Sequence, residues 1–434
     1  MNTEDEITAK DIQKALEKRT SLLPQEKLRL FVKYYFARRD MYLGILGKNP
    51  PPLYVLEIPV LKEKADHFKM AFKDVLPDVA FYYAVKSNNH PDVSRALVKS
   101  GFGLDVSSSL ELEMALGLDA GDIVFSGPGK TKEELALAAG NSGRTVVLLD
   151  SFGELTRLES VAAMNNTTVR TGVRLTNNPA GLWRKFGILL SDLPDFWHAV
   201  QKCPHIRLTG LQFHSSWNMT PVPQIEFIEK LGKVLEGMCE EFKRAVTFID
   251  IGGGYWPEHG EWLQPAGTPE GMLRKALGKE AGSAGDHYWV PALPIEHFAE
   301  NLGRAVKRHI LSVTECRICL EPGRWICNGA MHILLSVIDK KAPDLVITDA
   351  GTNSIGWERF ETDYFPVLNL TRPFMKEIPC DILGSLCTPH DVWGYSYWGE
   401  DIQNGDILMI PSQGAYTYSL RQNFIKPLPM VVVI

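Results

Sequence analysis

Eight short apolar runs alternate with amphipathic stretches between residues 80 and 321, and this alternation constrains the fold more than any other feature. Between most of the runs, apolar residues recur at helical spacing. Eight strand-then-helix units of this kind are what a (β/α)8 barrel requires, and mostly apolar strands are typical of a buried parallel sheet. The sequence therefore predicts an α/β protein built around a (β/α)8 TIM barrel. The runs are 80–85, 102–106, 122–126, 145–150, 168–175, 206–213, 246–251 and 316–321.

Outside the barrel segment, the expected helices and strands do not alternate. Residues 1–48 predict helices, which the prolines at 50–52 end. Beyond the barrel, apolar runs follow one another without helices and indicate a C-terminal β-domain, sandwich or barrel-like; one of these expected strands is 415–419. The expected domains are a helical N-terminal extension (1–48), a barrel (59–321) and a β-domain (49–58 with 322–434).

Composition narrows the classes of function. The 46 Lys and Arg residues against 52 Asp and Glu residues give a net charge of −6, mixed along the chain, so no nucleic-acid partner is expected. No run of about 18 apolar residues occurs, and the charged N-terminus lacks a signal-peptide core, so we expect no membrane partner and a cytoplasmic protein. Seven cysteines predict no disulfide framework, and no metal-ligand spacing occurs, so no metal is expected.

Polar residues gather where the predicted strands end, which is the edge of a parallel barrel that carries the active site. Each alone has an ordinary structural interpretation, such as a solvated lysine, a core histidine or a tight glycine turn. Together, a reactive amine, a histidine, an inward carboxylate and a glycine turn beside an arginine are typical of a pyridoxal phosphate pocket. These residues are Lys86, Arg174, His214, Gly252, Gly253, Gly254, Glu321 and Arg324.

Several motifs also resemble one known family in content and order. They are AFYYAVKSN (80–88), FGLDVSSSLELEMAL (102–116), FIDIGGGY (248–255), EPGRWI (321–326), CTPHD (387–391) and GAYT (414–417). This set resembles the fold-type III pyridoxal phosphate-dependent decarboxylases, which act on ornithine, diaminopimelate or arginine and share their barrel with alanine racemase. The resemblance runs from about Pro52 to the C-terminus.

The resemblance implies the cofactor pyridoxal 5'-phosphate and a role for each matching residue. Lys86 matches the Schiff-base lysine, His214 the ring-stacking histidine and Glu321 the partner of the pyridine nitrogen. Arg174 resembles an arginine near the ring oxygen, and Asp105 an aspartate just behind the cofactor. The phosphate binders correspond to Gly252, Gly253, Gly254, Gly323, Arg324 and Tyr416.

By the same resemblance, Cys387 is the cysteine that a partner subunit inserts to protonate the substrate carbanion. Lys86, His214 and Cys387 would then be the catalytic residues of a homodimer with shared active sites. Asp349 falls where relatives can contact substrate. Thr388 stands where decarboxylases of basic amino acids have an acid, which favours a neutral, acidic or carrier-attached distal group unless Asp349 or Asp391 meets an amine.

The implied activity is removal of the α-carboxylate of an amino acid or amino-acid conjugate, through an external aldimine and a quinonoid, with reprotonation of Cα. Two alternatives stay open. One is an amino-acid racemase of the same fold, against which Glu321 argues. The other is an inactive, protein-binding relative, against which retention of the whole residue set argues. The motif HSSW at 214–217 leaves open which of Ser215 and Ser216 contacts the cofactor.

Overall fold

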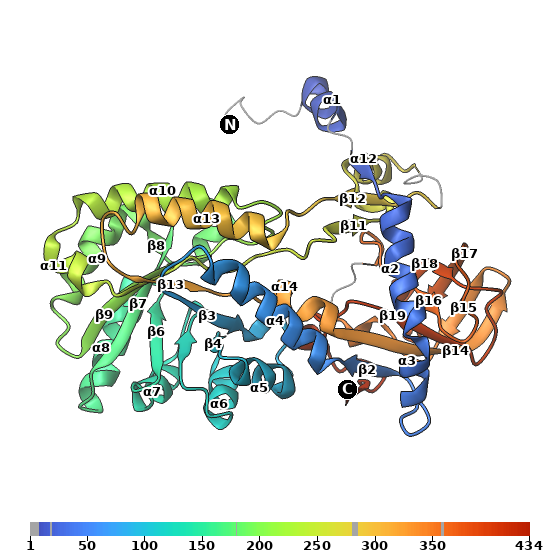
Figure 1. The fold of residues 1–434 in the computed structure, drawn as a ribbon, viewed down its shortest axis with the longest axis horizontal. Coiled ribbons are helices and arrows are strands. Elements are labelled where there is room, and N and C mark those ends of the chain that lie inside the picture. The colour runs from blue at the N-terminus through green and yellow to red at the C-terminus, as the bar shows by residue number, and fades with distance from the viewer. Residues whose placement is uncertain (1–7, 18–19, 179, 280–284, 357–359) are drawn as a thin grey trace. The chain divides into compact units, whose positions relative to one another are not determined.

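The computed structural model describes residues 8–17, 20–178, 180–279, 285–356 and 360–434 (Figure 1). The chain divides into two compact units. The barrel unit comprises Ile58–Glu258 and Leu293–Asn328, and the β unit comprises Met1–Glu57, His259–Ala292 and Gly329–Ile434. The segment 259–292, which the sequence leaves within the barrel, is thus grouped with the β unit.

The barrel unit contains a closed parallel sheet. Its strands follow the order β6-β5-β4-β3-β13-β10-β9-β7, and β6 also pairs with β7, which closes the ring. The two-residue β8 adds to the side of β7. All eight predicted strands are present, so the predicted (β/α)8 fold is confirmed. The strands are β3 (Val79–Ala84), β4 (Gly103–Val106), β5 (Ile123–Phe125), β6 (Thr145–Leu149), β7 (Val169–Thr176), β8 (Ile188–Leu189), β9 (Ile206–Phe213), β10 (Phe248–Asp250) and β13 (Arg317–Leu320).

Helices follow the barrel strands and lie outside the sheet (Figure 1). Several begin at a serine or threonine whose hydroxyl accepts a backbone N–H of the first turn; Thr131 and Glu134 form a complete capping box. These caps fix where each helix starts after its strand. The helices are α4 (Ile58–Lys73), α5 (Pro91–Lys99), α6 (Ser109–Gly117), α7 (Lys132–Gly140), α8 (Phe152–Met164), α9 (Leu193–Val200), α10 (Val222–Gly237), α11 (Glu240–Ala245), α13 (Ile295–His309) and α14 (Arg324–Cys327).

The barrel interior is packed with side chains rather than open. Tyr82, Val124, Leu148 and Cys319 form a buried cluster, and the ring of Phe248 packs against it. A Cβ atom at Gly210 would lie 2.1 Å from that ring, so a glycine is required there. Filling the interior leaves the strand ends as the place where polar residues can meet.

The β unit is built on an eight-stranded sheet with the order β15-β17-β18-β16-β19-β14-β2-β20, and β14 also pairs with β15. β18 was not predicted. The predicted strand at 415–419 is wrong: residues 418–420 form a 3-10 turn, and Tyr416 has a φ of +60°, which interrupts an extended run. The strands are β2 (Leu53–Leu56), β14 (Met331–Ala342), β15 (Leu345–Thr348), β16 (Leu368–Asn369), β17 (Glu377–Leu383), β18 (Val392–Trp398), β19 (Ile407–Ile410) and β20 (Met430–Val433).

The N-terminal helices belong to the core of the β unit. Leu28, Val32 and Tyr35 of α2 pack in one buried cluster with strand residues such as Leu334 and Met409. A three-stranded sheet, β1-β12-β11, joins the N-terminal segment to the 259–292 segment. The remaining elements of this unit are α1 (Ala9–Glu17), β1 (Ser21–Leu22), α2 (Gln25–Ala37), α3 (Arg39–Ile45), β11 (Glu261–Leu263), α12 (Pro269–Ala276) and β12 (Tyr288–Val290).

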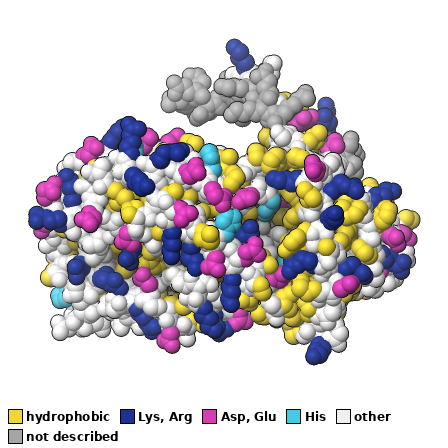
Figure 2. Space-filling view, in the orientation of Figure 1, with side chains coloured by type: hydrophobic (Ala, Val, Ile, Leu, Met, Phe, Trp, Pro, Cys, Tyr) yellow, Lys and Arg dark blue, Asp and Glu magenta, His cyan; other side chains and the backbone are white. Residues whose placement is uncertain are grey.

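The surface carries both signs of charge. Figure 2 shows basic and acidic side chains interspersed over the visible face, without a broad patch of one sign. Within the described ranges, no helix combines the length and apolar character needed to cross a bilayer.

Candidate active site

Lys86 lies in a short 3-10 turn directly after β3. Its Nζ donates a hydrogen bond to Oδ2 of Asp105, 2.7 Å away at the end of β4. Asp105 is fully buried, and its other oxygen accepts the hydroxyl of Ser126. Burial raises the pKa of Asp105 against the opposing charge of Lys86. Two adjacent strand ends therefore hold the amine in one position.

His214 and Glu321 meet across the ends of β9 and β13. Nδ1 of His214 lies 3.6 Å from Oε2 of Glu321, and it accepts the backbone N–H of Gly253 over 3.2 Å. Nε2 of Gln212 donates to both Glu321 oxygens at 3.4 and 3.3 Å. Glu321 is only 2% exposed. The carboxylate is therefore enclosed but held by long contacts.

Charge inside this cluster separates the ionisation states. Burial alone would raise the pKa of Glu321, but His214, Lys86 and Arg174 lower it to about 2. Burial lowers the pKa of His214, although the hydrogen bond and the charge of Glu321 raise it. Glu321 is thus ionised at neutral pH.

A third carboxyl group, Asp250 at the end of β10, was not singled out from the sequence. Its Oδ1 accepts the N–H of Gly252 over 2.8 Å, while its Oδ2 is buried without a hydrogen-bond partner among the described residues. Burial, followed by the charge of Glu321, raises its pKa well above the usual range. Oε1 of Gln212 is also buried without a partner. Unpaired buried polar atoms of this kind are expected at a ligand site rather than in a saturated core.

The glycine turn packs too closely for any side chain. Gly252 and Gly254 have φ values of +72° and +81°, and a Cβ at Gly253 would lie 2.1 Å from the carbonyl oxygen of Glu321. Asn218 is buried and ties this turn to the loop after β9, because its side chain donates to the carbonyl of Gly253 over 3.1 Å. Arg324 opens α14 on the next strand connection. The turn therefore presents backbone without side chains, in which Asp250 and His214 already hold the N–H groups of Gly252 and Gly253.

The structure separates the two serines of HSSW. Oγ of Ser215 accepts from Asn218 over 3.0 Å, whereas Oγ of Ser216 lies 3.3 Å from Nε2 of His214. Ser216 is therefore the serine beside the histidine ring. Arg174 is 9% exposed, with its guanidinium carbon 4.5 Å from the ring centre of Phe186.

The remaining predicted residues lie in the β unit. Cys387 is exposed on the loop between β17 and β18, next to Thr388. Asp391 is 2% exposed; its oxygens accept the N–H of Thr352 over 2.7 Å and the N–H of Leu386 over 2.6 Å. Asp391 is thus occupied in shaping the cysteine loop.

Asp349 and Tyr416 lie elsewhere in the same unit. Asp349 follows β15 and accepts the N–H of Ser336 over 3.0 Å, and burial raises the pKa of Asp349 to about 6. Tyr416 is half-buried in a turn with left-handed backbone.

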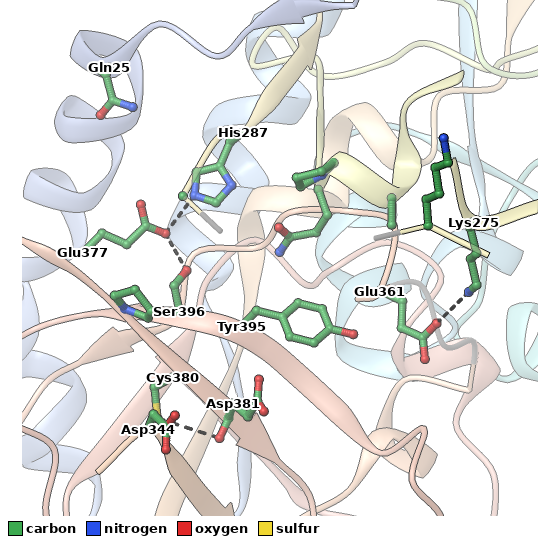
Figure 3. Close-up of a pocket in the computed structure, with 16 residues that line it drawn as sticks. Gln25, Lys275, His287, Asp344, Glu361, Glu377, Cys380, Asp381, Tyr395 and Ser396 are labelled. Atoms are coloured by element: carbon green, nitrogen blue, oxygen red, sulfur yellow. Dashed lines mark hydrogen bonds and ion pairs between the residues drawn. The ribbon is translucent and has the colours of Figure 1, made fainter. Parts of the chain in front are cut away.

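The β unit also contains a cavity of about 750 Å³. Figure 3 shows His287 and Ser396 both bound to Glu377, and Lys275 paired with Glu361. No residue that the sequence assigns to the site is among the described residues that line it. The cavity is therefore a feature separate from the candidate residues.

The barrel residues fit pyridoxal 5'-phosphate. An amine, a carboxylate ionised at neutral pH and a histidine lie at neighbouring strand ends, with a glycine turn whose close packing excludes side chains. Lys86 would hold the carbonyl carbon, Glu321 the pyridine nitrogen, His214 the ring face, and the glycine turn with Arg324 the phosphate.

Comparison with known proteins supports this conclusion. Residues 61–328, more than half of the chain, match the family described as pyridoxal-dependent decarboxylase, pyridoxal binding domain. The chain belongs to this family of pyridoxal phosphate-dependent decarboxylases. It is a carbon–carbon lyase that acts on amino acids, and its cofactor is pyridoxal phosphate.

Three relatives show how far the similarity extends. Diaminopimelate decarboxylase of Aquifex aeolicus (strain VF5) is 26% identical over 391 residues, which cover 86% of this chain and 84% of that protein. L-glutamyl-(BtrI acyl-carrier protein) decarboxylase of Niallia circulans is 24% identical over 383 residues, covering 81% and 82%. The crystal structure of Helicobacter pylori diaminopimelate decarboxylase with L-lysine superposes with a TM-score of 0.74 at 22% identity, covering 91% of this chain and 94% of that one. The structural likeness confirms the fold.

Proposed function

We propose that this decarboxylase removes the α-carboxylate of an amino acid or amino-acid conjugate at the barrel cluster of Lys86, His214 and Glu321. The observation that carries the proposal is a buried, ionised Glu321 at the same strand ends as an amine held by Asp105. When bound, pyridoxal phosphate accepts the electron pair released as the bond between Cα and the carboxylate breaks. Glu321 keeps the pyridine nitrogen protonated, which strengthens that acceptance.

The other residues position groups or move protons. Asp105 orients the amine of Lys86. His214 would cover the face of the cofactor ring, and Ser216 restrains its Nε2 side. Arg174 adds positive charge that keeps Glu321 ionised.

Reprotonation of Cα is assigned to Cys387. Its thiol gives a proton to the carbanion and regains one from solvent. Cys387 is exposed on its own unit, which suits a group that a partner subunit offers to a neighbouring barrel. We therefore propose a homodimer with shared sites, working in the cytoplasm, where its seven unpaired thiols stay reduced.

Mixed subunits test the sharing of sites. A subunit carrying Lys86→Ala and one carrying Cys387→Ala are each inactive alone. If each site combines both residues from different subunits, random mixing restores roughly a quarter of the wild-type activity. Full inactivity after subunit exchange would contradict shared sites.

The substrate class follows from Thr388. Without an acid there, a free distal ammonium loses its expected partner, so we propose a substrate whose distal group is neutral, acidic or attached to a carrier. The similarity to a decarboxylase named for a carrier-bound glutamyl substrate supports this choice. Asp391 does not supply the missing charge, because its oxygens are occupied by backbone N–H groups.

The test is carbon dioxide release from a panel of L- and D-amino acids, basic, acidic and neutral, together with acyl-carrier-bound aminoacyl groups. Turnover of conjugated or non-basic substrates is expected. Preferential turnover of ornithine, lysine or diaminopimelate would overturn the substrate proposal while leaving decarboxylation intact. Exchange of the α-hydrogen without carbon dioxide release would favour racemisation instead.

A further inference from the structure

Two indole rings lie near Arg324, the residue that the proposed function assigns to the phosphate. The guanidinium carbon lies 4.3 Å from the ring centre of Trp256 and 6.0 Å from that of Trp217. The two indoles are 5.8 Å apart and tilted by 31°. Both distances from the guanidinium fall within the range of cation–π attraction.

Both tryptophans are fixed to the phosphate-binding turns by backbone contacts. The N–H of Asn218 donates to the carbonyl of Gly254 over 3.0 Å, and the N–H of Trp256 lies 3.4 Å from the carbonyl oxygen of Asn218. Trp217 has a φ of +56°, a conformation that is costly for a bulky side chain and is found mainly where the surroundings enforce it. The rings are therefore placed by the same loops that form the glycine turn.

The burial of Trp256 argues against a role in filling space alone. The residue is 6% exposed, and its indole N–H is buried without a hydrogen-bond partner among the described residues. A phenylalanine would fill much of the same volume without that desolvated donor. Among aromatic side chains, tryptophan has the face that attracts a cation most strongly.

Stacking suits a guanidinium that must bind an anion. An aromatic face holds the flat side of the group and leaves its N–H edge directed outward. A guanidinium already held by a neighbouring ring also loses less side-chain freedom when the anion arrives.

We propose that Trp256 and Trp217 are positioning residues, an aromatic clamp that holds Arg324 in the orientation that binds the cofactor's phosphate. The proposal rests on the assignment of Arg324 to the phosphate. Trp256 contributes more than Trp217, because it is nearer and buried whereas Trp217 is 51% exposed.

The test compares two ligands of the full-length apoprotein: pyridoxal phosphate and pyridoxal, which lacks the phosphate. Dissociation constants are measured from the visible absorbance of the bound ligand. Trp256→Leu is expected to raise the dissociation constant for pyridoxal phosphate about tenfold, and Trp217→Leu about threefold. The larger effect is expected at Trp256 because cation–π attraction is stronger at desolvated sites. Neither variant changes the affinity for pyridoxal.

Trp197→Leu is the matched control. Trp197 in α9 is 9% exposed and also has a buried indole N–H without a partner, but it packs against Phe242 on an outer helix. This variant should change neither affinity. If Trp256→Leu does not fold, Trp256→Phe keeps an aromatic ring and should show a smaller, phosphate-specific loss.

Arg324→Gln separates this inference from the proposed site. If Arg324→Gln leaves the affinity for pyridoxal phosphate unchanged, the phosphate assignment itself is wrong. If it weakens binding but Trp256→Leu does not, the clamp is wrong. Equal weakening of both ligands by Trp256→Leu also overturns the clamp, since it indicates general damage. Combined with Arg324→Gln, Trp256→Leu should have no additional effect on phosphate-specific affinity.

Discussion

The two units each bury a glutamate beside a histidine, yet the two clusters are built differently. Glu57 in the β unit and Glu321 in the barrel are both 2% exposed, and each has a pKa of about 2 although burial alone would raise it. The paired histidines, His332 and His214, both have a pKa lowered first by burial. Ionisation alone therefore does not distinguish them.

Hydrogen bonding does distinguish them. Glu57 accepts from Nε2 of His332 over 2.8 Å and from the hydroxyl of Tyr42 over 2.6 Å, and it also pairs with Arg38. The hydrogen bonds and the ion pair of the Glu321 carboxylate are 3.3 Å or longer, and Oδ2 of Asp250 and Oε1 of Gln212 have no hydrogen-bond partner within the described part of the chain. A saturated network stabilises a fold, here by attaching the N-terminal helices to the sheet. An unsaturated one keeps capacity for a ligand.

The largest expected effect comes from Glu321→Gln. Loss of the charge should lower kcat by about 100- to 1,000-fold, the range for removing one electrostatic contact at a reacting centre. The melting temperature should fall less than in Glu57→Gln, because the Glu321 carboxylate loses only contacts of 3.3 Å or longer and Asp250 offsets part of its contribution. Steady-state rates and thermal unfolding of the same preparation check both parts. Unchanged turnover would remove the assignment of Glu321 to the pyridine nitrogen.

Glu57→Gln should show the opposite pattern. Removing one partner of a buried ion pair lowers the free energy of unfolding by about 3 kcal/mol. This value is at the low end of the usual range because Arg38 is partly exposed. Activity per folded molecule should remain. Denaturant unfolding followed by circular dichroism measures the loss. A stable but inactive Glu57→Gln variant would contradict the division of roles between the clusters.

The sequence predicted the barrel cluster well because a parallel barrel brings strand ends together. Once eight strands were assigned, Lys86, His214 and Glu321 had to lie on one edge, and the structure places them there. Asp250 also ends a strand and could have been found by the same rule. It was passed over because the glycines that follow it are the more conspicuous signal.

Other features depend on contacts that spacing along the chain does not encode. The approach of Trp256 to Arg324 joins two loops from different strands. The grouping of segment 259–292 with the β unit follows from the pairing of β12 with β1 and of β11 with β12. The turn at Tyr416 reads as a strand by composition, and only its left-handed backbone shows otherwise.

Acid titration sharpens the comparison of the clusters. Glu57 has a folded pKa of about 2, below its ordinary value of 4.5, so its stabilisation is complete above pH 4.5 and is lost as the pH falls toward 2. Glu321 contributes stability in the same pH range. Asp250 beside it has a raised pKa, so its contribution to the free energy of unfolding increases as the pH falls. The contributions of Glu321 and Asp250 therefore partly cancel. Between pH 6 and pH 3, the dependence of the urea midpoint on pH should therefore become weaker in Glu57→Gln than in Glu321→Gln. An equal pH dependence in the two variants would show that Asp250 does not offset Glu321.

Asp349 is less completely hydrogen-bonded than Glu57. Its carboxylate accepts the backbone N–H of Ser336, and burial raises its pKa to about 6. If it binds the distal amine of a basic substrate, KM for that substrate should fall roughly tenfold from pH 5 to pH 7 as the carboxylate ionises. Asp349→Asn should remove this dependence and leave kcat nearly unchanged. Steady-state kinetics with ornithine and with a neutral amino acid provide the comparison. A KM for ornithine that ignores both pH and the substitution would show that Asp349 does not replace the acid missing at Thr388, and would strengthen the case for a substrate without a distal amine.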